Sequence, residues 1–155
     1  MTGAHPESEA RMVDVTAKEV TAREAVARGI VRMTDATRAL VLERRLAKGD
    51  ALEVARIAGI MGAKKTAELV PLCHPVALGA VAVEFAPDAY GISVTATAHT
   101  SDRTGVEMEA MTAVAAAALT LYDMVKGTER GVTITDVKLM RKSGGRTGEW
   151  VRTEG

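Results

Sequence analysis

The sequence has a single cysteine, Cys73, and only four aromatic residues among its 155 positions: one Trp, two Tyr and one Phe. One cysteine cannot form a disulfide within the chain, and this fits a reducing cytoplasm, which is the predicted location. Four aromatic side chains are too few for the stacking platform that binds single-stranded nucleic acid. Lys and Arg total 20, as do Asp and Glu, so the net charge is zero. Without a positive field, we expect neither a nucleic-acid nor a membrane partner.

No run of residues approaches the roughly 18 apolar positions that a membrane span requires. Residues 1–11 carry several charged side chains and no apolar core, so they are predicted to be a mobile tail and not a signal peptide. Residues 12–155 are predicted to form a single α+β domain, because a chain of about 150 residues can bury enough surface to fold without a metal or disulfide.

Alternating apolar residues and turn signals define the expected elements. Residues 20–33 could form a strand or a helix, and their poor helical spacing favours a strand. Helices are expected at 35–48, 50–69 and 104–126, with Asp50–Glu53 and Thr104–Glu107 as capping boxes. Strands are expected at 80–85, 92–100 and 132–140, and a flexible loop at 142–148. The order β-α-α-β-β-α-β predicts a ferredoxin-like antiparallel sheet with helices packed on one face.

Small residues are frequent in the two strands expected to form a hairpin. Ala80, Ala82, Ala96 and Ala98 would let a second subunit approach the uncovered side of the sheet closely. This composition favours association between copies of the chain.

Asp123 lies in the last turn of the predicted helix 104–126, after a mostly apolar stretch. The negative end of the helix dipole and burial would both raise its pKa. Lys126 is three residues further on and can reach the carboxylate on the same face. Such a pair suits proton transfer, although the spacing alone favours a simple local ion pair.

Two glutamates occupy the first part of the same helix. Glu107 has a structural explanation in the capping box, whereas Glu109 has none and is the better candidate for a ligand contact. Fourteen positions separate Glu109 from Asp123, so they lie about 21 Å apart along the axis. One chain therefore cannot direct both at the same atom, and a shared reaction would need a long ligand or a site between subunits.

Other candidate groups lie in rigid or glycine-rich segments. Pro71 and Pro75 fix the backbone around Cys73 and His74, but no second cysteine completes a common zinc pattern. Cations that could bind a small anionic ligand are Lys48, Lys64, Lys65, Arg103, Lys126, Lys138, Lys142 and Arg146. The segment 142–148 lacks the spacing of a P-loop.

The same residues resemble a known family, the molybdenum cofactor biosynthesis protein C family of cyclic pyranopterin monophosphate synthases. The resemblance runs from residue 12 to about 149. It rests on MVDVT at 12–16, KGD at 48–50, ARIAGI at 55–60, PLCHP at 71–75, TGVEMEA at 104–110, YDM at 122–124 with Lys126, and KSGG at 142–145.

This resemblance implies a lyase that converts 3′,8-cyclo-7,8-dihydroguanosine 5′-triphosphate to cyclic pyranopterin monophosphate and releases pyrophosphate. It assigns Asp123 as general acid/base, with Lys126 and Lys48 as catalytic lysines. The implied substrate-binding residues are Leu72, Cys73, His74, Met108, Glu109, Glu107, Lys64, Lys142, Arg23 and Lys18.

The resemblance also implies partners: a homohexamer built as a trimer of dimers, with sites at subunit interfaces, and a transient contact with the upstream radical enzyme. No metal ligand set and no required cofactor are predicted, although Mg²⁺ could accompany the triphosphate. Two rival hypotheses are a regulatory module that binds a phosphorylated nucleotide without turnover and an RNA-binding α+β domain.

Overall fold

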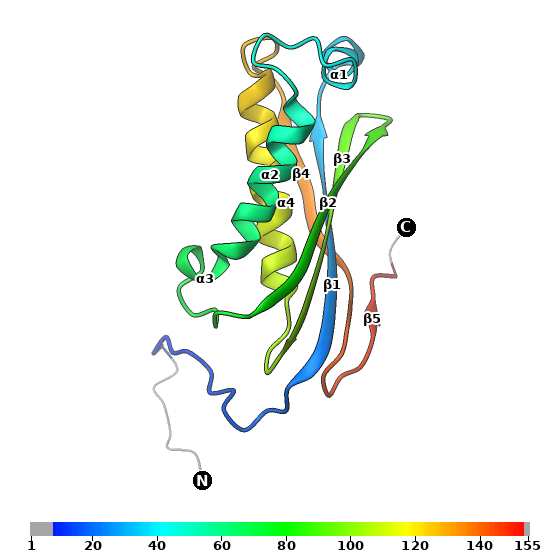
Figure 1. Ribbon diagram of the computed structural model, residues 1–155. Coiled ribbons are helices and arrows are strands. Elements are labelled where there is room, and N and C mark those ends of the chain that lie inside the picture. Colours follow the sequence, from blue (N-terminus) through cyan, green and yellow to red (C-terminus); the bar gives the residue numbers. More distant parts are fainter. Residues whose placement is uncertain (1–7, 154–155) are drawn as a thin grey trace.

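A computed structural model describes residues 8–153. The expected tail, 1–11, falls largely outside this range, and its described part, residues 8–11, is exposed and contains no strand and no helix. The domain then contains a twisted five-stranded sheet and a layer of helices (Figure 1). Its elements are β1 (Thr21–Arg32), α1 (Asp35–Leu42), α2 (Ala51–Lys64), α3 (Thr66–Leu69), β2 (Leu78–Asp88), β3 (Gly91–Asp102), α4 (Glu107–Val125), β4 (Thr133–Ser143) and β5 (Trp150–Val151).

The strand order is β2-β3-β1-β4-β5, and each neighbouring pair is antiparallel. Helices α2 and α4 lie side by side on one face of this sheet (Figure 1). The predicted ferredoxin-like α+β fold is confirmed. The ambiguous segment 20–33 forms a strand, and it is the centre of the sheet, because β1 pairs with both β3 and β4.

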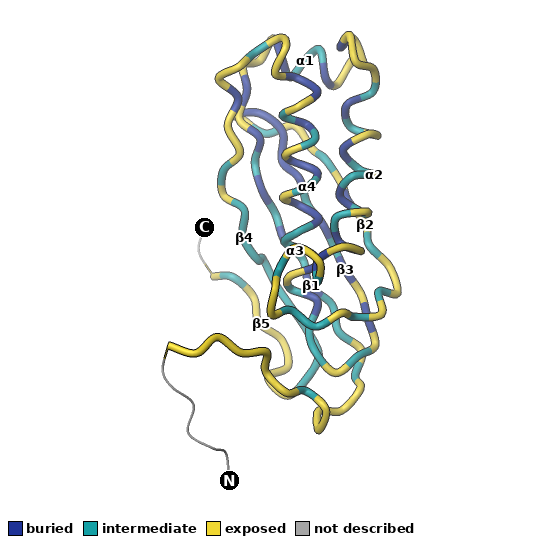
Figure 2. Tube along the Cα trace, turned by 90° about the vertical axis from the view of Figure 1, so that its left-hand side faces the viewer, coloured by how far each residue is buried: buried dark blue, intermediate teal, exposed yellow. Residues whose placement is uncertain are grey.

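The core lies between the sheet and the helices, as the buried positions in Figure 2 show. Side chains alternate along β3, so Ile92, Val94, Ala96 and Ala98 all face the helices and are fully buried. The expectation that Ala96 and Ala98 face a second subunit is therefore wrong. Ala80 and Ala82 belong to the other side of the sheet and are exposed.

Small residues set the close approach of α2 to α4. A Cβ atom built on Gly59 would lie 3.0 Å from a Val83 methyl, and one built on Gly62 would lie 2.7 Å from the Ala116 Cβ. Ala55 and Ala63 of α2 are buried on the same side as Gly59. With no longer side chains between them, the two helices pack almost backbone to backbone.

Several element ends differ from the predictions. Helix α1 ends at Leu42 and not at residue 48, because Arg44 has φ 58° and cannot continue a right-handed helix. The predicted helix 50–69 divides after Lys64, where the buried Thr66 hydroxyl donates to the Ala63 carbonyl. Asp50 does cap α2, since its carboxylate accepts the Glu53 N–H.

The ends of α4 and β4 are also displaced. Helix α4 begins at Glu107, so Val106 is its N-cap and the capping box from Thr104 does not form. Strand β4 continues through Ser143, into the segment expected to be a loop. The unpredicted strand β5 pairs Trp150 with Lys142.

Within residues 8–153, α4 is the one helix whose length and composition would allow it to cross a membrane. Half of its apolar stretch is buried in this structure, against the sheet and α2. A buried core helix of a soluble domain passes the same test, so its apolar character is accounted for by the fold.

Candidate functional site

The candidate residues form two clusters at opposite ends of α4. Asp123, Lys126 and Lys48 lie at its carboxyl end. Glu107, Met108 and Glu109 open its first turns, and the loop 71–75, the end of α2 and the end of β4 lie near them.

Asp123 lies between two ammonium groups. One carboxylate oxygen is 2.9 Å from Lys126 Nζ, and the other is 3.3 Å from Lys48 Nζ. Lys48 also donates to the Asp123 backbone carbonyl at 3.1 Å, which satisfies an acceptor in the last turn of the helix. Lys48 comes from the loop between α1 and α2, so the tertiary fold is what completes this cluster.

The carboxyl group of Asp123 is held ionised. The hydrogen bond from Lys126, followed by that from Lys48, lowers its pKa below the ordinary value. In turn, the carboxylate raises the pKa of Lys126. The Asp123 side chain is 54% exposed, so the prediction of a buried acid with a raised pKa is wrong for the single chain. Its neighbours in the sequence are apolar, but Asp123 occupies the exposed side of the helix.

Glu109 has the opposite environment. It is 2% exposed, and its Oε1 atom has no hydrogen-bond partner among the described residues. The Cys73 thiol lies 4.0 Å from its Oε2 atom. Burial raises the pKa of the Glu109 carboxyl, and burial together with the nearby Glu109 charge raises the pKa of the thiol. A buried carboxyl with a free oxygen is a group prepared to bind a polar ligand.

Glu109 lines a pocket of about 440 Å³ between the end of α2 and the start of β2. Lys64 lines the same pocket, so a cation and a carboxyl face one cavity. Leu72 and Met108 are exposed apolar side chains, from the loop before β2 and the first turn of α4. This end of the molecule therefore combines apolar surface with a few polar groups, as ligand sites commonly do.

Glu107 pairs across the fold and does not cap its own helix. Its carboxylate lies 3.1 Å from Nζ of Lys142 on β4. The structural explanation of Glu107 as part of a capping box is therefore replaced by an ion pair that joins two predicted site residues.

Arg23 and Lys18 line a pocket of about 320 Å³ at the start of β1, together with Arg146. The Arg23 guanidinium donates to the Asp102 carbonyl at 3.0 Å. A Cβ on Gly145 would lie 2.4 Å from Arg23 Nη1, so the glycine-rich turn after β4 lies directly against this arginine. In the sequence, Arg146 is only one of eight candidate cations. The folded turn places it in the same pocket as Arg23 and Lys18.

A further pocket connects these two. Leu78 and Gly79 line both it and the Glu109 pocket, and Arg23 lines both it and the pocket of Lys18. His74, in the loop 71–75, is partly exposed. The three pockets therefore adjoin and form one surface at the amino end of α4, which Lys64, Glu109, Arg23 and Lys18 line.

The structure does not bring this surface to Asp123. Glu109 and Asp123 lie 14 positions apart in one continuous helix, which separates them by about 21 Å. Among residues 8–153, no group of three or more His, Cys, Asp or Glu side chains is placed to hold a metal ion.

Comparisons with known proteins identify the family of the chain. The sequence matches the MoaC family over residues 12–145. It is 56% identical over 143 residues to the cyclic pyranopterin monophosphate synthase of Dinoroseobacter shibae, covering 91% of this chain and 90% of that protein. The synthase of Cereibacter sphaeroides is 57% identical with the same coverage. Cyclic pyranopterin monophosphate synthase 2 of Mycobacterium tuberculosis is 53% identical, covering 92% of this chain and 86% of its own length.

Proposed function

The chain belongs to the MoaC family, and we infer from this that it is a cyclic pyranopterin monophosphate synthase of molybdenum cofactor biosynthesis. It is a lyase that converts 3′,8-cyclo-7,8-dihydroguanosine 5′-triphosphate to cyclic pyranopterin monophosphate. The purine is rearranged to a pterin, a cyclic phosphate forms, and pyrophosphate leaves. Such a reaction needs proton transfer at the rings and positive charge at the phosphates.

The carboxylate between two lysines carries the mechanistic proposal. Asp123 is ionised in the free protein and can accept a proton, and the two lysine side chains that pair with it are hydrogen-bond donors. A bound polyanion would compete for the two lysines and exclude water, and both effects would raise the pKa of Asp123. Asp123 would then return its proton as an acid. We assign it the general acid/base role, with Lys126 and Lys48 as its catalytic partners.

The opposite end of α4 is proposed to recognise the substrate. Glu109 offers a buried carboxyl with an unpartnered oxygen, which suits the hydrogen-bonding edge of the guanine-derived ring. Leu72, Cys73, His74 and Met108 would contact the same ring system, with Lys64, Glu107 and Lys142 as further polar contacts. Lys18 and Arg23 share a pocket with Arg146, and three cations there suit the triphosphate.

Both ends of α4 are needed for one reaction, yet a single chain holds them far apart. We therefore propose that each active site forms between subunits, with Asp123 from one copy and Glu109 from another. The proposed assembly is a hexamer arranged as a trimer of dimers, located in the cytoplasm. It would receive its substrate from the upstream radical enzyme through a transient contact. No resident cofactor is proposed, and turnover with and without a chelator tests whether Mg²⁺ must accompany the triphosphate.

Replacing Asp123 by Asn tests the proposed chemistry. D123N keeps the shape of the side chain but cannot accept a proton, so pyrophosphate release should fall by about 10² to 10⁴. Folding should be retained, because Asp123 is exposed. The matched control is D35N, which alters another exposed i,i+3 pair, with Arg38 on α1, and should leave turnover unchanged. Undiminished turnover by D123N would refute the assignment, whereas binding of the triphosphate without any turnover by the wild type would favour the regulatory module.

A further inference from the structure

Lys48, which contacts Asp123, belongs to the segment that connects β1 to α2. This segment comprises α1 and the loop 43–50, and Lys48 is exposed near its end. Val41 and Leu46 are buried and attach the segment to the core. Arg44 pairs with Asp50 at 3.2 Å and closes the loop on itself. These contacts shape the segment, and its Lys48 end contacts α4 directly through Asp123. A separate contact ties the beginning of the segment to the turn after α4.

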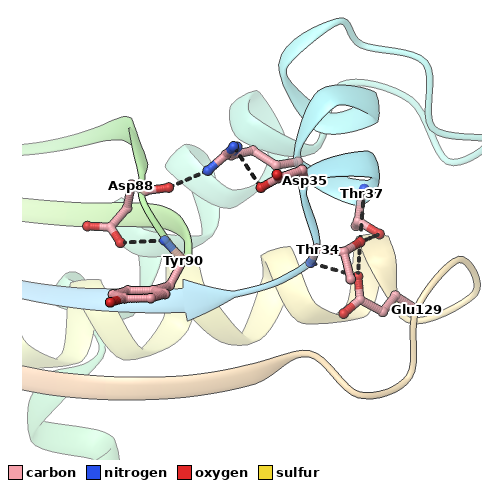
Figure 3. Close-up of polar contacts among 7 residues, drawn as sticks. Thr34, Asp35, Thr37, Asp88, Tyr90 and Glu129 are labelled. Carbon is pink, nitrogen blue, oxygen red and sulfur yellow. Dashed lines mark hydrogen bonds and ion pairs between the residues drawn. The ribbon is translucent and has the colours of Figure 1, made fainter.

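Glu129 makes that connection. It lies in the turn that follows α4, where its backbone N–H donates to the Val125 carbonyl at 2.9 Å. One oxygen of its carboxylate accepts both the backbone N–H and the hydroxyl of Thr34, at 3.1 and 2.9 Å. Thr34 is the N-cap of α1. Figure 3 shows the Glu129 side chain directed at Thr34 and Thr37.

We propose that Glu129 is a positioning residue, which fastens the beginning of the Lys48-bearing segment to the turn that follows Lys126. This inference rests on the proposed function, because it assigns Glu129 the task of keeping Lys48 in register with Asp123. Glu129 and Asp123 are only six positions apart, so the last turn of α4 carries the catalytic carboxylate and the turn directly after it carries Glu129. Glu129 itself touches neither lysine.

The remaining polar contacts of α1 go elsewhere. Arg38 donates to the Asp88 carbonyl and pairs with Asp35 at 2.9 Å, as Figure 3 shows in part. Met33, just before α1, donates to the Tyr90 carbonyl at 3.0 Å. These bonds attach α1 to the β2–β3 hairpin. Loss of the Glu129 carboxylate would therefore release α1 from α4 while leaving it attached to the sheet.

The hydrogen bonds from Thr37 and Thr34 lower the pKa of Glu129, so its carboxylate keeps its charge at neutral pH. We call the contact of this carboxylate with Thr34 and Thr37 the fastening. The charged groups that face Asp123 are Lys126 on α4 and Lys48 on the loop. If Lys48 recedes, Asp123 keeps only Lys126, and its pKa rises toward the ordinary value. Loss of the fastening should therefore raise the pKa of Asp123, which a general loss of stability would not do.

The experiment measures kcat against pH for the wild type and four variants. E129A removes the oxygen that accepts from Thr34. E129D keeps the carboxylate charge but on a side chain that is one methylene shorter. E129Q keeps an acceptor oxygen on a side chain of the same length. In E129A and E129D the acid limb of the profile should move to higher pH, with kcat lower by about tenfold to 10²-fold. E129Q should restore the wild-type limb. D35N, which alters α1 without touching the fastening, should not move it.

An unmoved acid limb in folded, active E129A or E129D overturns the proposal, as does an equal shift in D35N. If E129A does not fold, E129D decides. If the wild type itself shows no turnover, the proposed function fails. A second measurement then decides this inference: the pKa of the Asp123 carboxyl in each variant, followed by carbon-13 NMR during a pH titration. A raised pKa in E129D with a normal one in E129Q supports the fastening, and unchanged values in both refute it.

Discussion

Close packing of α2 on α4 depends on the absence of a side chain at Gly62. An added Cβ would lie 2.7 Å from the Ala116 Cβ, against about 3.5–4.0 Å for a normal carbon contact. Neither methyl group can rotate away, so in G62A the helices must separate. Overpacking of this kind costs about 1–3 kcal/mol. Alanine returns about 1 kcal/mol of helix propensity, which leaves a net loss of about 0–2 kcal/mol.

Because propensity offsets the clash, the single variant is a weak test and a double-mutant cycle is needed. A116G removes the opposing methyl at a propensity cost of about 1 kcal/mol. In the double variant the propensity changes cancel, so the coupling energy isolates the clash, at about 1–3 kcal/mol in favour of the pair. G127A is the control, since a Cβ there meets nothing within 4 Å.

The assay is urea unfolding at a fixed protomer concentration, because association of copies would shift the midpoint. A coupling energy below about 0.5 kcal/mol, within the additivity expected of independent sites, would show that the two helices do not pack as described.

Two further predictions concern Glu109. Its raised pKa means that the folded chain retains a proton that the unfolded chain loses above 4.5, so the contribution of Glu109 to the free energy of unfolding should fall as pH rises through and beyond that value. In urea titrations at a series of pH values, the free energy of unfolding of the wild type should therefore fall relative to that of E109Q, and a difference independent of pH would contradict the assigned environment. Co-expression of D123N with E109Q tests the shared site: mixed oligomers should recover activity at about a quarter of their sites if two copies contribute to each. No recovery beyond the separate variants would place each site within one chain.

The sheet was predictable because its signals are local. Alternation along 92–100 identified β3. It did not show which side the helices cover, and Ala96 and Ala98 were therefore assigned to the wrong side. The boundaries of α1 and α4 were not predictable in this way. The left-handed conformation of Arg44 closes α1 through local bonds, from the Arg44 and Arg45 N–H groups to the Val41 and Leu40 carbonyls, and periodicity does not record it. The pairing of Glu107 with Lys142 joins two distant segments.

The candidate site shows the same limit. The spacing of Asp123 and Lys126 predicted their ion pair, which the structure confirms. Lys48, which lies 75 positions from Asp123, reached the list of catalytic residues only through the family resemblance. The apolar neighbours of Asp123 suggested burial, but an exposed position on an otherwise buried helix has the same neighbours. The sign of its pKa shift therefore required the fold.

Helix α4 acts as a rigid spacer with one reactive group near each end. Every added residue would advance Asp123 by about 1.5 Å and rotate it by about 100° relative to Glu109. In the proposed shared site, an insertion or deletion within 109–123 would therefore misalign two different active sites at once, one at each end of the helix. The proposed assembly thus fixes the number of residues between these two carboxyl groups, a constraint that the surface turns of the fold do not share.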